Sequence, residues 1–176
     1  MNYPQTMPAC RLAAVLGLLL SIWSTSAFAS PVERLEAVGS ATLRVFLWTI
    51  YDSRLYSPDG NYEGIEPDLA LEITYRRDIK AQDLLERTRK EWRELGLYEA
   101  GHEQWLQQLA GLWPDVKEDD SLVLRVDENL ASQFFFNGQA IGAIASAEFT
   151  RNFLAIWLSE DSSYPRLRNR LVGLSD

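Results

Sequence analysis

Cysteine is nearly absent from this chain of 176 residues. The one cysteine, Cys10, precedes the apolar run of a predicted signal peptide, so we expect the mature protein to contain no thiol. A chain without thiols forms no disulfide, no cysteine nucleophile and no thiolate metal site. An exported protein of this kind must depend on its hydrophobic core for stability.

Histidine is equally scarce. The one histidine, His102, has no second histidine or cysteine pair near it and lacks an HExxH context, so we expect a hydrogen-bonded or exposed side chain and not a metal ligand. The sequence has no GxSxG elbow, P-loop or dinucleotide fingerprint. We therefore expect no metal, no cofactor and no hydrolytic chemistry.

Positive charge is in deficit. Loss of Arg11 with the signal peptide leaves 16 basic and 25 acidic residues, a net charge of −9. Phosphate backbones and anionic lipid headgroups repel such a surface. Nucleic acid is not an expected partner.

Residues 1–29 have the pattern of a signal peptide. Arg11 gives a positive start, Leu12 to Trp23 is a short apolar run, and the segment ends in the small-x-small pattern before a cleavage site at Ala29. The run is too short for a membrane span. We expect residues 30–176 to form a single domain, periplasmic or secreted, without a membrane span after cleavage; the sequence does not indicate an oligomeric state.

An antiparallel meander followed by a helix is the clearest structural pattern. Strands are expected at residues 122–126, which are apolar at nearly every position as in a strand covered on both faces, and at 132–136 and 139–142. An Asn-Gly pair between the last two strands is a strong hairpin signal. Ser146 is expected to cap a helix that aims one apolar face at the sheet. The residues of that face are Phe149, Phe153, Ile156 and Trp157.

The preceding part of the chain adds further strands and helices. Apolar alternation predicts a long strand or strand pair over residues 41–56, with a bend or bulge at Asp52-Ser53, and a strand over 69–75. Three helices are expected as well: one capped by Asp78 and ended by Gly96, one over residues 102–112, and a short one capped by Ser163. The fold class is therefore α+β, a large antiparallel sheet with helices packed on one face in an open-faced sandwich.

Aromatic side chains are plentiful on the elements that face the space between sheet and helices. A dense aromatic core is the favoured explanation, and a lined pocket is the alternative. Lys80 and Arg87 lie two turns apart on one helix edge, where a cation could neutralise the carboxylate of a fatty acid. Ion pairs of Arg87 with Asp83 and Glu91 on the helix surface are the favoured alternative.

Several short motifs, in their order and spacing, resemble the chalcone isomerase-like family, and especially its bacterial exported branch. The motifs are Val38-Gly39, Val45-Phe46, residues 51–56, 71–79 and 92–98, Phe136-Asn137-Gly138 and residues 156–158. The resemblance covers essentially the whole mature chain and implies a large antiparallel sheet with helices on one face. It also implies one of two activities, since members either cyclise chalcones or bind fatty acids in the same cleft.

Most positions that match the family's catalytic residues are replaced. Lys80 stands at the position of the cleft tyrosine, Arg87 at that of the asparagine, and Tyr51 near that of the first-strand threonine. The substrate-holding arginine should lie near Gly39, where the sequence has none, and the nearest is Arg44. The resemblance therefore favours binding over isomerase activity.

The leading hypothesis is a periplasmic, non-catalytic binding protein for a small apolar or fatty-acyl ligand held between sheet and helices. The residues predicted to contact this ligand are Trp48, Tyr51, Tyr56, Lys80, Arg87, Phe135 and Phe153. One alternative is an isomerase or lyase on an unknown substrate, with Tyr51, Arg44 and Ser146 as catalytic candidates. Another is a structural or partner-binding domain whose core is filled by its own side chains.

Overall fold

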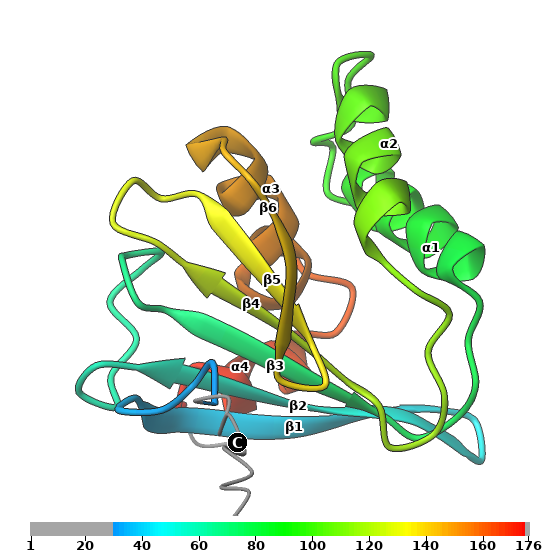
Figure 1. The fold of residues 1–176 in the computed structure, drawn as a ribbon. Coiled ribbons are helices and arrows are strands. Elements are labelled where there is room, and N and C mark those ends of the chain that lie inside the picture. Colours follow the sequence, from blue (N-terminus) through cyan, green and yellow to red (C-terminus); the bar gives the residue numbers. More distant parts are fainter. Residues whose placement is uncertain (1–29, 175–176) are drawn as a thin grey trace, which may run out of the picture.

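A computed structural model describes residues 30–174, and in them a six-stranded antiparallel sheet carries four helices (Figure 1). The strands lie side by side in chain order: β1 (Glu36–Val45), β2 (Trp48–Ser57), β3 (Ala70–Tyr75), β4 (Ser121–Val126), β5 (Ser132–Phe136) and β6 (Gln139–Ile144). The helices are α1 (Ala81–Glu94), α2 (His102–Leu112), α3 (Ala147–Leu158) and α4 (Pro165–Leu171). The predicted α+β class is confirmed, and the predicted signal peptide at 1–29 lies outside the described residues.

The meander of β4, β5 and β6 forms as predicted. Asn137 and Gly138 have φ values of 48° and 79°, the left-handed conformation that a two-residue hairpin turn requires at both centres. The Asn137 side chain also accepts a hydrogen bond of 2.8 Å from the Ser121 backbone N–H. Local turn chemistry and a contact with the neighbouring strand thus fix the same hairpin.

The expected bend at Asp52-Ser53 is wrong, because both residues lie inside β2. The chain reverses earlier, at Phe46 and Leu47, where Val45 pairs with Trp48. Neither turn residue is one of the usual turn formers, so the reversal has no sequence signal. The pairing of β1 with β2 shifts register near this turn, because Leu43 pairs with Tyr51 whereas Arg44 pairs with Thr49.

Helix α1 begins differently from the prediction. Its N-cap residue is Lys80, which makes no side-chain cap. The Asp115 carboxylate accepts from the Ala81 backbone N–H at 2.9 Å, and it therefore takes the place of a cap. Asp78, the predicted cap, accepts instead from the backbone N–H of Glu118 at 3.0 Å. The loop before β4 thus supplies the acceptor that sequence reasoning placed within the helix segment.

The other two predicted caps have different outcomes. Ser146 caps α3 as predicted, since its hydroxyl accepts from the Phe149 N–H at 3.1 Å. Ser163 does not cap α4, whose N-cap is Tyr164. The Ser163 hydroxyl instead donates to the Glu91 carboxylate at 2.7 Å, so the residue before α4 is tied to α1.

The main core lies between the sheet and the helices. Leu55, Trp92 and Phe149 are fully buried there, and Phe149 stacks on Phe153 with ring centroids 5.4 Å apart. His102 is also buried, with its ring 4.6 Å from that of Trp105, and it accepts from the Glu99 backbone N–H at 3.1 Å. This agrees with the expected hydrogen-bonded histidine.

A smaller apolar cluster covers part of the opposite face of the sheet. Val123, Tyr56 and Ala70 are buried there against Phe135 and the segment before β1, including Leu35. The expectation that the strand around 122–126 is covered on both faces is thus confirmed.

Candidate functional site: a cavity between sheet and helices

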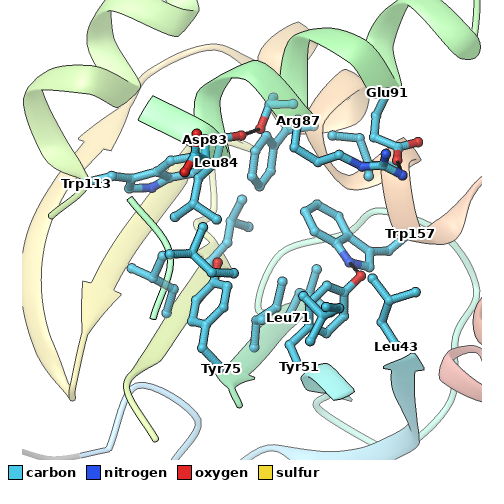
Figure 2. A pocket seen from close by; sticks show the side chains of 18 of the residues that line it. Leu43, Tyr51, Leu71, Tyr75, Asp83, Leu84, Arg87, Glu91, Trp113 and Trp157 are labelled. Atoms are coloured by element: carbon cyan, nitrogen blue, oxygen red, sulfur yellow. Dashed lines mark hydrogen bonds and ion pairs between the residues drawn. The ribbon is translucent and has the colours of Figure 1, made fainter. Parts of the chain in front are cut away.

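A cavity of about 350 Å³ lies between the inner face of the sheet and the helices (Figure 2). Its volume falls within the roughly 300–1,000 Å³ typical of small-molecule sites. Its lining is mainly apolar and includes Leu71 and Ile73 from β3, Leu124 from β4, and Phe153 and Ile156 from α3. The alternative of a core filled by its own side chains does not fit this cavity.

Helix α1 supplies a wall with polar groups. Asp83, Leu84, Arg87, Thr88 and Glu91 line the cavity, and their spacing puts them on one face of the helix. The predicted ion pair of Arg87 with Glu91 exists, but it lies at the cavity and not on a solvated flank. Its geometry determines which ligand charge the cavity can accept.

Arg87 is held at the cavity by two neighbours. Its Nη2 forms an ion pair with Glu91, whose side chain is 4% exposed, and donates to the Tyr164 hydroxyl at 3.1 Å. Within residues 30–174 its Nε and Nη1 groups have no hydrogen-bond partner, and the side chain is 43% exposed. A guanidinium has five N–H donors, so this one retains donors for a ligand.

Two tyrosine hydroxyls also belong to the cavity wall. The Tyr51 oxygen accepts from Trp157 Nε1 at 2.9 Å, and in the described part of the chain its own proton has no acceptor. Tyr75 packs edge-on against Tyr51, with ring centroids 6.4 Å apart. Burial raises the pKa of both hydroxyls above the ordinary tyrosine value. Both therefore remain protonated donors at neutral pH.

The structure brings three of the seven predicted ligand contacts to the cavity. Tyr51, Arg87 and Phe153 line it. Lys80 does not, because as the residue before α1 it points to solvent and pairs with Asp115 at 2.7 Å. The expected pair of cations at the slot is thus corrected to Arg87 alone.

The other three predicted contacts lie on the wrong side of the sheet or at its end. Tyr56 faces outward and donates to Glu72 at 2.8 Å, and Phe135 belongs to the same outer cluster. Trp48 is 66% exposed at the tip of the β1–β2 hairpin. Side chains along a strand alternate between the two faces of the sheet. Tyr51 and Phe134 face inward, so Tyr56 and Phe135, an odd number of positions away on the same strands, face outward.

Of the three catalytic candidates, Tyr51 alone lines the cavity in the described structure. Arg44 is exposed, opposite Thr49 near the hairpin tip, and Ser146 is occupied as the cap of α3. No side chain fits at Gly39 either, because a Cβ there would lie 2.0 Å from the Arg170 carbonyl oxygen. Tyr51, Arg44 and Ser146, the three candidates for an isomerase site, are therefore not brought together.

Sequence reasoning missed part of the polar wall. Tyr164 and Ser163 reach the Arg87–Glu91 pair from more than 70 positions away in the chain, which no local pattern indicates. Trp113 also lines the cavity, and its Nε1 is buried without a hydrogen-bond partner among residues 30–174. Of these polar contacts, only the ion pair of Arg87 with Glu91 could be predicted from the sequence, because the two residues have i,i+4 spacing on one helix.

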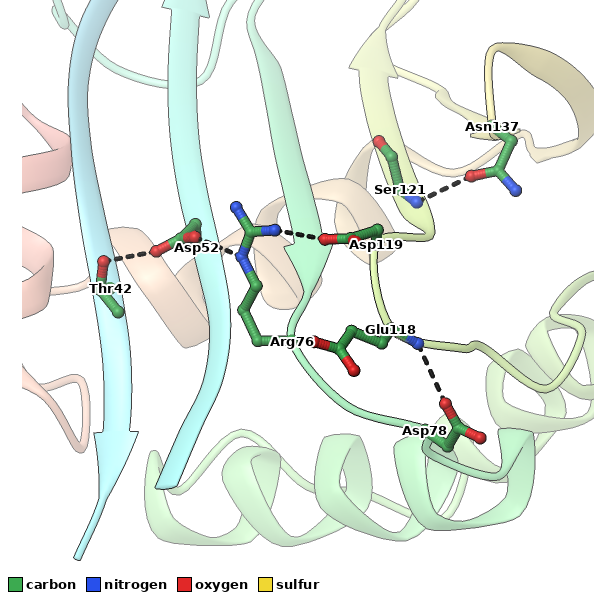
Figure 3. A network of polar contacts seen from close by, with 8 residues as sticks. All are labelled: Thr42, Asp52, Arg76, Asp78, Glu118, Asp119, Ser121 and Asn137. Carbon is green, nitrogen blue, oxygen red and sulfur yellow. Dashed lines mark hydrogen bonds and ion pairs between the residues drawn. The ribbon is translucent and has the colours of Figure 1, made fainter. Parts of the chain in front are cut away.

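Part of the outer face of the sheet is polar, beside the apolar cluster that contains Tyr56 and Phe135. Asp52 accepts from the Thr42 hydroxyl and from Arg76 Nε at 2.7 Å, and Arg76 also pairs with Asp119 (Figure 3). The Thr42 hydrogen bond, followed by Arg76, lowers the pKa of Asp52. The Arg76 guanidinium is thus already paired with two carboxylates. We therefore take the apolar inner cavity as the candidate site.

Comparisons with known proteins agree with this architecture. The sequence model of a family described as chalcone isomerase-like matches residues 32–173. An uncharacterized protein of Haemophilus influenzae is 25% identical over 147 residues, which span 82% of this chain and 71% of that protein. The crystal structure of a fatty-acid binding protein of Arabidopsis thaliana superposes with a TM-score of 0.59 at 12% identity, over 80% of this chain and 88% of that chain. Likeness at that identity shows a shared fold.

Proposed function

The chain belongs to the chalcone isomerase-like family, and from this premise we propose that it binds, without transforming it, an apolar ligand of the fatty-acyl type between sheet and helices. The observation that carries the proposal is the apolar cavity of about 350 Å³ with hydrogen-bond donors in its wall. The fold shared with a plant fatty-acid binding protein supports it. The separation of Arg44 and Ser146 from the cavity favours binding over catalysis.

The ligand's two ends have different surroundings in this proposal. The acyl chain lies on the apolar floor formed by Leu71, Ile73 and Leu124. The oxygen atoms of its head lie toward Tyr51 and Arg87, which offer N–H and O–H donors. Arg87 is already paired with the buried Glu91, and the Asp83 carboxylate also lines this wall, so the polar end has no excess positive charge. An acyl head that accepts hydrogen bonds suits it, and a carboxylate must share the guanidinium with Glu91.

A cavity-filling variant tests the proposal. Ile73→Trp places an indole on the cavity floor, and we expect palmitate affinity, measured by titration calorimetry with delipidated protein, to fall at least about tenfold. Thr74→Trp is the matched control, since it adds the same indole to β3 on the outer face of the sheet, where Thr74 lies opposite Asp52. The proposal fails if the unsubstituted protein binds no palmitate and no acyl lipid copurifies with it by mass spectrometry.

We also propose that the protein acts in the periplasm. The support is the signal-peptide pattern of residues 1–29. N-terminal sequencing of the protein from the periplasmic fraction of its host should give Ser30 as the first residue. Recovery in the cytoplasm with residues 1–29 intact would contradict this location.

A further inference from the structure

The tip of the β1–β2 hairpin is an unusual apolar projection. Residues 30–174 contain five exposed large apolar side chains, and four of them are consecutive at this tip. Val45, Phe46, Leu47 and Trp48 are exposed by 36%, 97%, 97% and 66%. The tip lies at the lower right of Figure 1, at one end of the sheet. Four adjacent exposed apolar residues indicate a contact surface.

The turn conformation at the tip does not explain why Phe46 and Leu47 occupy it. Phe46 has a φ of 54°, and a bulky residue with positive φ is a rare and strained choice in a turn. The β5–β6 hairpin of the same protein uses Asn137 and Gly138 for its two-residue turn. Phe46 and Leu47 therefore do not serve the turn, and their exposure to water is unfavourable unless something covers them.

We propose that this tip inserts into the surface of a lipid bilayer and brings the cavity to the membrane. A stable protein–protein interface buries about 800 Å² on each partner, more than the four side chains of a hairpin tip supply. A bilayer accepts single apolar side chains and gains from each one buried. The size of the projection thus fits a membrane better than a protein partner.

The residues flanking the tip suit the depth of the lipid headgroups. The guanidinium of Arg77 lies 5.5 Å from the centre of the Trp48 ring, in a cation–π contact. Tryptophan and arginine are favoured at the boundary between headgroups and acyl chains. The neighbouring Arg76 is already paired with the carboxylates of Asp52 and Asp119 (Figure 3).

The tip is continuous with the cavity. Val45, the first residue of the tip, lines the cavity, and so do Leu43 and Ile50, each two positions from the tip along β1 and β2. An acyl chain leaving the bilayer along the hairpin would meet apolar side chains from the tip to the cavity. This step rests on the proposed function, whereas insertion of the tip itself does not.

The charge of the protein predicts which membrane it contacts. The formal net charge of −8 opposes adsorption to anionic lipid, so the apolar tip must provide the attraction. No helix within residues 30–174 has the length and apolarity to cross a bilayer. Vesicles of zwitterionic phosphatidylcholine should be sufficient for binding.

A double substitution tests the tip without risk to the fold. Phe46→Gly with Leu47→Asn puts glycine at the one turn centre with positive φ, as a two-residue type II′ turn favours, so the hairpin should be at least as stable. We expect flotation of the purified protein with phosphatidylcholine vesicles to weaken at least about tenfold in this variant. Leu174→Ser, which removes the other exposed apolar side chain, is the control and should float like the unsubstituted protein.

The outcomes separate this inference from the proposed function. Equal flotation of the double variant, or none by the unsubstituted protein, overturns the membrane contact. A tip-dependent dimer in sedimentation without vesicle binding overturns it as well, in favour of a second copy. Palmitate binding in solution should be unchanged by the double substitution, so loss of flotation with normal palmitate binding supports the inference. If no variant binds palmitate while flotation still depends on the tip, the proposed function fails and the membrane contact stands.

Discussion

Arg87 and Glu91 act as a unit at the polar end of the cavity. Glu91 is buried, receives a hydrogen bond from Ser163 and compensates the guanidinium, which would otherwise face an apolar space. An uncompensated charge beside a cavity with few polar groups is unfavourable, so the pair stabilises the wall. It also limits how strongly the cavity can attract an anion.

Glu91→Gln should therefore change the preferred head group of the ligand. Glutamine retains an oxygen for Ser163 but leaves Arg87 unpaired, so we expect the ratio of palmitate to methyl palmitate affinity to rise about tenfold. The free energy of unfolding should fall by about 1–3 kcal/mol, because the buried partner of a charge is lost. Calorimetric titration with both ligands and urea denaturation measure these effects.

The double variant Arg87→Gln with Glu91→Gln is the control for this prediction. It removes both charges, so the gain in preference for palmitate should disappear. An unchanged affinity ratio in Glu91→Gln would show that the ligand head does not reach the guanidinium.

Buried tyrosines predict loss of stability at alkaline pH. Burial raises the pKa of Tyr51 and Tyr75 above 10.0, whereas the unfolded chain releases these protons near the ordinary value. Above about pH 10 the native state therefore holds more protons than the unfolded state, and the free energy of unfolding falls by up to about 1.4 kcal/mol per pH unit for each tyrosine. Below that pH the contribution is fully present.

Tyr75→Phe should make this alkaline decline shallower. We expect the slope of unfolding free energy against pH, from urea denaturation above about pH 10, to decrease by up to about 1.4 kcal/mol per pH unit. Ile73→Val is the control, because it alters the same cavity wall but removes no titrating group, so the slope should not change. Identical slopes in all three proteins would refute the assigned burial effect.

At the scale of elements, the contact between β1 and α4 closes one end of the cavity. Gly39 lies under the last turn of α4, with the space of a Cβ occupied by the Arg170 and Leu171 carbonyl oxygens. Tyr164 and Leu167 from the start and middle of this helix line the cavity. A change in the packing of β1 against α4 should therefore also move the residues of α4 that line the cavity.

Gly39→Ala should displace α4. A methyl group 2.0 Å from a carbonyl oxygen forces backbone to move, and we expect a loss of about 1–3 kcal/mol in urea denaturation together with weaker palmitate binding. Gly111→Ala is the matched control, since its Cβ meets no atom within 4 Å and α2 should gain about 0.5–1 kcal/mol. Equal stability of Gly39→Ala and the unsubstituted protein would contradict this close packing.

The elements that could be predicted from sequence are those with local signals. The Asn137-Gly138 turn and the Ser146 cap lie among the residues they control, and both are confirmed. The turn at Phe46 and Leu47 lacks such a signal and was missed. Asp115 caps α1 from a distant loop, so no pattern near residue 81 indicates it.

The candidate site was predictable to a smaller extent for the same reason. Tyr51, Arg87 and Phe153 were identified by residue type and by helix or strand position. Tyr56 and Phe135 were assigned to the wrong face, because residue type does not tell which parity of a strand faces the helices. The contact of Arg87 with Tyr164 depends on how α1 and α4 meet, which is a property of tertiary packing.

At the scale of the whole molecule, the proposed ligand should stabilise the fold. A ligand that binds the native state alone adds about 2.7 kcal/mol to the free energy of unfolding at a hundredfold excess over its Kd. We therefore expect delipidation to lower the Tm and palmitate to restore it, measured by differential scanning calorimetry. The Ile73→Trp variant should show no such response, and a Tm unaffected by lipid in the unsubstituted protein would argue against an occupied cavity.

The chain-order sheet has a consequence for how the protein folds. Each strand pairs with its sequence neighbour, so most of the sheet can grow by short loop closures, which are rapid. The exception is the connection from β3 to β4, which contains α1 and α2. Docking of α4 on β1 joins residues 131 positions apart, Gly39 and Arg170, and a closure of that length comes late. During refolding, the change in intrinsic fluorescence should thus be complete before the chain can bind palmitate. The ligand would then enter a cavity that is already almost formed, and it would not direct the folding of the sheet.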